Sequence, residues 1–156
     1  MLNIFMSKPE SYDDPRSVKE ILHYLQQMYR DMTILARQYS LRFLYLLTKN
    51  WKAQKLEAFL EDLILMLDQL ISFSESVQDM KLIFMALDRL SDSQKILRAF
   101  ASDHSFQLMS CFSRYISKCG DQHTIDDLIK FVKRLSKLEA SHEAIVASKV
   151  YDLIMN

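Results

Sequence analysis

Histidine and cysteine are the residues through which this chain could hold a metal. Cys119 and His123 have the C-x3-H spacing of a zinc ligand pair, and His104, Cys111 and His142 are the nearest further candidates. Structural zinc sites usually contain two such close pairs, whereas this sequence contains one. We therefore expect no metal site, and nothing in the sequence indicates a bound cofactor.

Ser141, His142 and Glu143 have the residue types used in nucleophilic catalysis. Adjacent residues of a helix do not face one another, so these three are poorly placed to act together. Ser141 is instead predicted to be an N-cap, with Glu143 in the first turn, where its charge suits the helix dipole. Acidic residues on the polar face of the stretch 51–73 alternate with Lys and Gln, which is typical of a solvated helix face. We predict that the protein is not an enzyme.

The two cysteines, Cys111 and Cys119, lie on one predicted helix. Their separation along it is about 12 Å at 1.5 Å per residue, which is too far for a disulfide. We expect them to be small core side chains in a reducing compartment. The chain shows no convincing secretory signal and no run of 18 apolar residues that would predict a membrane span. The sequence therefore predicts an intracellular protein, cytoplasmic or nuclear.

Composition indicates an all-α protein. The chain has 156 residues, of which 49% are hydrophobic, but it contains one Gly and two Pro. Sheet proteins need Gly and Pro for tight turns, and nucleotide-binding folds need Gly where the backbone approaches a ligand. We predict a flexible N-terminal arm over residues 1–16 and a single all-helical domain over residues 17–156.

Apolar periodicity and polar turns divide that domain into seven or eight helices. Short connections favour antiparallel neighbours. Ser17 and Glu20 fit a capping box, and a kink is expected near Ser40. The expected helices cover 17–39, 41–50, 51–73, 77–90, a short segment after Ser93, a segment after Asp103, 124–138, and a last segment after Ser141.

The stretch from Trp51 to Phe73 is the most hydrophobic, and its apolar half is wide enough to need several neighbours. We expect it to be the core helix.

Elsewhere, residues 87–91 (LDRLS) resemble residues 132–136 (VKRLS), 45 positions later. That spacing lies in the range of HEAT and armadillo repeats. The sequence leaves two architectures open: a compact bundle, or a short armadillo/HEAT-like helical-repeat stack.

Trp51, Ala58 and Leu65 interrupt the polar half of the predicted core helix at heptad spacing. On a straight helix this spacing drifts by only about 20° per step, so the three would form one narrow column. An exposed Trp and Leu flanked by charge are typical of interface anchors, which makes the column a candidate partner-binding site. The alternative is that another helix of the same domain covers it.

Lys130, Lys133, Arg134 and Lys137 share one arc of the predicted helix over 124–138, opposite its apolar face. This basic strip is a candidate docking site for an acidic peptide, phosphates or nucleic acid. The alternative is a solvated face whose charges suit the helix dipole, with Asp126 at its start. Nucleic acid is the weaker possibility, because the chain has 20 Lys and Arg against 20 Asp and Glu.

These features together predict a protein-interaction module, either an adaptor or a subunit of a larger complex. It would dock a partner helix or peptide on an apolar groove, and the basic strip would suit a partner with acidic residues. The first alternative is a self-associating structural bundle that forms a homo-oligomer. A remote alternative is a nucleic-acid or phosphate binder acting through the basic helix over 124–138.

Overall fold

The computed structural model describes residues 14–29, 33–74, 76–103, 105–118, 122–150 and 152. Every regular element in these ranges is helical, so the predicted all-α class is confirmed. The α-helices are α2 (Pro15–Tyr29), α3 (Ile34–Asn50), α4 (Ala53–Leu56), α5 (Leu60–Phe73), α6 (Val77–Leu90), α7 (Gln94–Asp103), α8 (Ser105–Ser117), α9 (Gln122–Leu135) and α10 (His142–Ala147). Two 3-10 turns, η2 (Glu57–Phe59) and η3 (Glu139–Ser141), precede α5 and α10.

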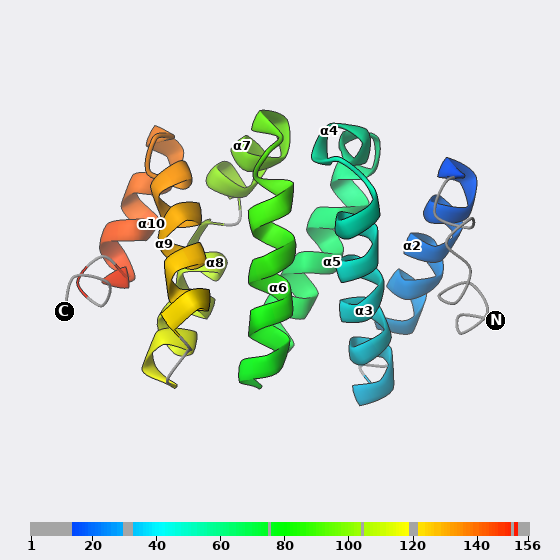
Figure 1. The fold of residues 1–156 in the computed structure, drawn as a ribbon, viewed down its shortest axis with the longest axis horizontal. Helices are drawn as coiled ribbons and strands as arrows, with labels where there is room; N and C mark the ends of the chain where they lie inside the picture. Colours follow the sequence, from blue (N-terminus) through cyan, green and yellow to red (C-terminus); the bar gives the residue numbers. More distant parts are fainter. Residues whose placement is uncertain are drawn as a thin grey trace.

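The long helices form two rows, and the core lies between them (Figure 1). Helices α3, α6 and α9 lie side by side in one row, with α6 in the middle. In the other row, α2 contacts α5, α5 contacts α8, and α8 contacts α10. Packing of α2 on α3, α3 on α5, α5 on α6 and α6 on α8 joins the two rows.

Several helix starts recur along the sequence at an interval of 45 residues, whereas α3 precedes α6 by 43. Helices α2, α5 and α8 begin at residues 15, 60 and 105, and α6 and α9 begin at 77 and 122, so each step is 45 residues. The similar segments 87–91 and 132–136 have the same offset, and they lie at the ends of α6 and α9. The interval lies in the range of HEAT and armadillo repeats, and both architectures stay open.

Aromatic rings join the two rows in the second half of the chain. The Phe84 ring of α6 lies 5.0 Å from both Phe112 and Tyr115 of α8, in edge-to-face geometry. Phe112 in turn lies 5.8 Å from Phe131 of α9. Such pairs add about 0.5–1.5 kcal/mol each beyond the area that they bury. Cys111 is buried nearby in α8, as predicted, and burial raises the pKa of its thiol to about 11.

The predicted start of the first helix is wrong by two residues. Helix α2 begins at Pro15, a residue whose fixed φ suits the first helical position. The Asp14 carboxylate accepts hydrogen bonds from the Arg16 backbone N–H and the Ser17 hydroxyl, both at 3.1 Å. The backbone bond from Arg16 is the main cause that holds the pKa of Asp14 below its ordinary value. The Ser17 hydroxyl therefore donates to Asp14 and does not cap the helix. The rest of the predicted arm, residues 1–13, lies outside the described residues.

The predicted kink near Ser40 is also wrong. Helix α2 ends at Tyr29, and Thr33 caps a new helix, α3, by accepting a hydrogen bond from the Ala36 N–H at 3.1 Å. Helix α3 then runs through Ser40 without a break, and the Ser40 hydroxyl donates to the Ala36 carbonyl one turn earlier at 2.8 Å. The serine resembled a helix boundary in sequence, but in the structure its hydroxyl is satisfied inside the helix.

The single helix predicted from Trp51 to Phe73 is interrupted. Trp51 ends α3, and its backbone N–H donates to the Leu47 carbonyl. Lys52 is extended, and the short helices α4 and η2 follow before α5 begins. The Trp51 side chain is only 4% exposed, and its ring lies 5.9 Å from that of Phe59. The Lys55 ammonium stands 3.8 Å from the indole centroid. Trp51 is therefore a core residue at a corner of the chain.

At the end of the chain, the predicted N-cap role of Ser141 is wrong. Its hydroxyl is buried and lies within hydrogen-bond distance of the Leu135 and Leu138 carbonyls, at 2.6 and 2.8 Å, and it makes no cap to α10. The preceding 3-10 turn brings this hydroxyl back to the end of α9. Helix α10 ends at Ala147, after six residues, and Val146 within it is 77% exposed.

Trp51 and Leu65 provide a matched test of the corner between α3 and α4. Trp51→Ala should lower the free energy of unfolding by about 3–5 kcal/mol, because it empties a buried aromatic site. Leu65→Ala, at a side chain that is 46% exposed, should cost far less. Urea denaturation followed by far-ultraviolet circular dichroism measures both. Equal losses would contradict the burial of Trp51.

Candidate interaction surfaces

The structure separates the three residues of the predicted interface column. Trp51 is buried at the corner between α3 and α4, whereas Ala58 and Leu65 are exposed on η2 and α5. The column required one straight helix, and the chain changes direction between Trp51 and Leu60. The geometric basis of that prediction is therefore wrong, and its alternative, cover by the same domain, describes Trp51 correctly.

Ala58 lines an open cleft with a volume of about 740 Å³, where the start of α2, η2, the start of α5 and α7 meet. Side chains of both charge signs line this cleft, together with Phe59 and Leu60: Arg16, Lys19, Lys95, Glu57, Glu61 and Asp62. Glu57 is already engaged, because its carboxylate accepts a hydrogen bond from the Ser93 hydroxyl at 2.5 Å. The balanced lining gives the cleft no net preference for an anion or a cation.

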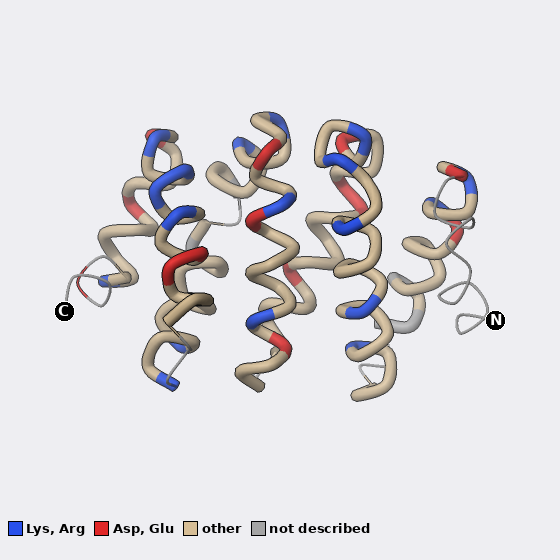
Figure 2. Tube along the Cα trace, in the orientation of Figure 1, with Lys and Arg blue, Asp and Glu red and all other residues tan. Residues whose placement is uncertain are grey.

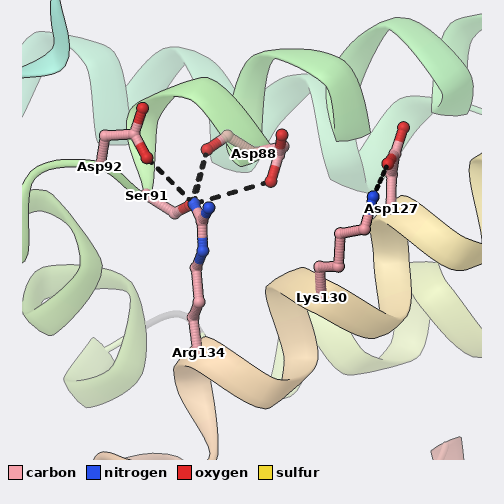
Figure 3. Close-up of polar contacts among 6 residues, drawn as sticks. All are labelled: Asp88, Ser91, Asp92, Asp127, Lys130 and Arg134. Carbon is pink, nitrogen blue, oxygen red and sulfur yellow. Dashed lines mark hydrogen bonds and ion pairs between the residues drawn. The ribbon is translucent and has the colours of Figure 1, made fainter.

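Two residues of the basic strip form ion pairs in the described part of the chain, and the other two do not. Lys130 forms an ion pair with Asp127 one turn earlier, at 3.0 Å (Figure 3). Arg134 reaches from α9 to the end of α6, where it contacts Asp88, Ser91 and Asp92 (Figure 3). Lys133 is exposed on α9, and Lys137 is exposed in the turn that follows. Lys130 is itself exposed, so Lys133 and Lys137 differ from it in forming no ion pair within the described ranges.

Arg134 joins two neighbouring helices of the row formed by α3, α6 and α9, which we call the front row. Its Nη1 lies 3.2 Å from the Asp88 carbonyl oxygen and 3.2 Å from an Asp92 carboxylate oxygen, and it also donates to the Ser91 hydroxyl. The Asp88 carboxylate is 3.6 Å away, close enough for an ion pair but too far for a hydrogen bond. This Asp88 oxygen accepts no hydrogen bond within the described part of the chain. Arg134 is therefore bound mainly through groups other than that carboxylate.

Partial burial raises the pKa of the Asp88 carboxyl above its ordinary value. The neighbouring carboxylates of Asp127 and Asp92 act in the same direction, whereas the cations of Arg134 and Lys130 act against it. Desolvation outweighs the arginine here because the ion pair is long and lacks a direct hydrogen bond.

Arg89 lies 45 positions before Arg134 and makes the corresponding contact between α6 and α3. Its Nη1 donates to the Tyr45 carbonyl at 3.4 Å, and its guanidinium lies 5.0 Å from the centroid of the Tyr45 ring. In both places a hydroxyl three residues further on donates to the same carbonyl: Thr48 to Tyr45 and Ser91 to Asp88. The front-row helices are therefore joined twice by one pattern. The similarity of residues 87–91 and 132–136 contained both arginines, but it could not show which carbonyls they bind.

Charge is divided unequally between the two rows. Helices α3, α6 and α9 carry eight Lys and Arg against four Asp, a net charge of +4. Helices α2, α5 and α8 carry three Lys and Arg against four Asp and Glu, a net charge of −1. Figure 2 shows basic residues along all three front-row helices. Sequence reasoning missed this surface because it counted charge over the whole chain, where the signs balance.

Two cations of α3 complete the basic surface. Arg42 and Lys49 lie seven residues apart, hence on one side of the helix, and both are exposed. We call Arg42, Lys49, Lys133 and Lys137 the four surface cations. None of them forms an ion pair with another residue in the described ranges. Lys49 and Lys133 lie in last turns, where a cation also suits the helix dipole, but Arg42 is far from either end of α3.

Among the described residues, the candidates for catalysis and metal binding do not come together. His142 Nε2 contacts the Ser136 carbonyl at 2.7 Å, and the Ser141 hydroxyl is directed to two other carbonyls, so the two do not form a nucleophile–base pair. Within the described ranges, no group of three or more His, Cys, Asp or Glu side chains is placed to hold a metal ion. His104 and Cys119, two of the predicted candidates, lie outside those ranges.

Comparison of the chain with protein-family models, with curated proteins and with solved structures finds no match. Among the described helices, none is both long enough and apolar enough to cross a bilayer.

Replacing Arg134 tests its role as a link between α6 and α9. Arg134→Met keeps most of the apolar stem and the helix propensity, and it should lower the free energy of unfolding by about 1 kcal/mol, since the ion pairs are partly exposed. Lys133→Met, at the adjacent exposed position, should change it by less than about 0.5 kcal/mol. Urea denaturation measures both, and equal effects would show that the link does not stabilise the fold.

Asp88→Asn tests the raised pKa of Asp88. A carboxyl whose pKa is raised by folding stabilises the fold only while it is protonated, and this contribution is lost as the pH rises through the folded-state pKa. The asparagine variant carries no such proton. The difference in unfolding free energy, variant minus wild type, should therefore shift in favour of the variant between about pH 3 and pH 7. Urea denaturation across this range measures it; a difference that stays flat, or shifts toward wild type, would contradict the effect.

Proposed function

We propose that this chain is a non-enzymatic protein-interaction module that binds a protein partner through the outer surface of α3, α6 and α9. The observation that carries the proposal is the set of four surface cations. The acids Asp88, Asp92 and Asp127 are engaged by Arg134 and Lys130, whereas Arg42, Lys49, Lys133 and Lys137 remain exposed and unpaired in the described part of the chain. Ion pairing accounts for the paired charges and the helix dipole suits Lys49 and Lys133, but neither accounts for Arg42 or for the net charge of +4 on the three helices.

The two-row arrangement supports the same proposal. Helix α6 is flanked by α3 and α9 and backed by α5 and α8, so the row presents three adjacent helices as one extended surface (Figure 1). Extended surfaces of stacked helices are suited to binding partners over a large area. The predicted adaptor or complex-subunit role agrees with this geometry, although the binding surface proposed is the front row rather than the Trp51 column.

Matched charge reversals test the proposed surface. Lys133→Glu/Lys137→Glu should lower partner recovery in crosslinked co-purification from the native source by tenfold or more at physiological salt. Lys19→Glu/Lys95→Glu, at two exposed lysines outside the front row, applies the same charge change and should leave recovery unchanged. Circular dichroism establishes that both variants are folded. Equal recovery by both variants, or an equal loss from both, would overturn the assignment of this surface.

Self-association is the second candidate, and one apolar cluster favours it. Ile34, Leu35 and Phe73 are 67%, 57% and 48% exposed. A hydrogen bond from Arg37 to the Phe73 carbonyl brings the start of α3 and the end of α5 together. Exposed apolar side chains gathered at one place are typical of association surfaces. Light scattering across a hundredfold range of concentration separates the candidates: a constant monomer mass would exclude self-association through this cluster.

A further inference from the structure

We propose that the partner segment is an acidic peptide in extended conformation, which lies across α6 and places its negative charges on the cations of α3 and of α9. This inference rests on the proposed function and names the chemistry of the segment recognised. It follows from how the four surface cations are distributed over the front row.

The four surface cations form two pairs on opposite sides of α6. Arg42 and Lys49 belong to α3, Lys133 lies on α9, and Lys137 lies just beyond its end. Helix α6 contacts both α3 and α9. Packed helices are about 8–10 Å apart, so the two pairs are separated by roughly 16–20 Å. An extended peptide covers that distance in about six residues.

The surface of α6 between the two pairs has no net charge, with two Lys and Arg against two Asp on this helix, and is partly apolar. Met85 and Leu82 of α6 are half-buried there, and Arg89 is engaged with Tyr45 of α3. An extended segment with acidic residues at both ends and an apolar residue at its centre therefore matches the row in charge and polarity. Methionine adapts well to varied apolar side chains, which suits a peptide-binding surface.

Charge complementarity favours a peptide over nucleic acid. The front row has a net charge of +4, but exposed Asp126 and half-buried Asp79 lie on the same helices. A nucleic-acid backbone presents phosphates at a short regular interval and would bring several of them close to these acids. A peptide with two separated acidic groups can contact the cations at both ends and avoid the acids.

The probe is a fluorescein-labelled nonapeptide with glutamate at its first two and last two positions, leucine at the centre and serine elsewhere. Its control has the same composition with the four glutamates adjacent. Fluorescence anisotropy with the full chain should show at least tenfold tighter binding of the spaced peptide. Arg42→Glu/Lys49→Glu and Lys133→Glu/Lys137→Glu should each weaken that binding tenfold or more, and Lys19→Glu/Lys95→Glu should leave it unchanged.

Several results would overturn the inference. Equal binding of the two peptides, or sensitivity to only one of the two cation pairs, would show that the segment does not cross α6. Tighter binding of a 12-base-pair DNA duplex than of the spaced peptide would identify the surface as a nucleic-acid site. If the spaced peptide does not bind while reversal of Lys133 and Lys137 still abolishes partner recovery, the proposed function stands and the acidic extended segment is wrong.

Discussion

The contacts of α6 with its neighbours are the constraint on which the rest of the structure depends. This helix packs against α3 and α9 within its row and against α5 and α8 behind it. Its buried side chains include Ile83, Phe84 and Leu87, and Phe84 meets two aromatic rings of α8. Because dense packing in a core fixes the position of each helix, the placement of α6 sets both the separation of α3 from α9 and the surface that the three helices share.

Hydrogen bonds from two arginine side chains add directional contacts to this apolar packing. Arg89 and Arg134 each reach back to a backbone carbonyl of the preceding front-row helix, on Tyr45 and on Asp88. Each link is partly exposed and contributes modestly to stability, but a hydrogen bond requires a defined geometry that apolar contact does not. The repeated links therefore favour one register between neighbouring helices. The Arg134 link also engages Asp88 and Asp92 at the end of α6.

Local signals in the sequence predicted several elements well. Ser76 caps α6 by accepting a hydrogen bond from the Asp79 N–H, Ser93 does the same for α7, and the apolar stripe of α9 is buried as its periodicity indicates. Such features depend on residues within one or two turns of each other, so a sequence shows them directly. The errors came where one local cue had two uses. Ser40 satisfies its hydroxyl inside a helix instead of ending one, and Ser141 donates to the end of α9 instead of capping α10.

The sequence by itself determined the all-α class, most helix positions and the presence of a basic strip, because composition, periodicity and capping act over short distances. Only the tertiary structure decided which of those residues are available for binding. Trp51 is buried because the chain turns at Lys52, and Arg134 is engaged because α6 lies beside α9, although its partners are more than 40 residues away in sequence. The +4 charge of the front row likewise exists only once α3, α6 and α9 become neighbours. Exposure and the pairing of charges depend on contacts between distant segments, and one segment's sequence does not contain that information.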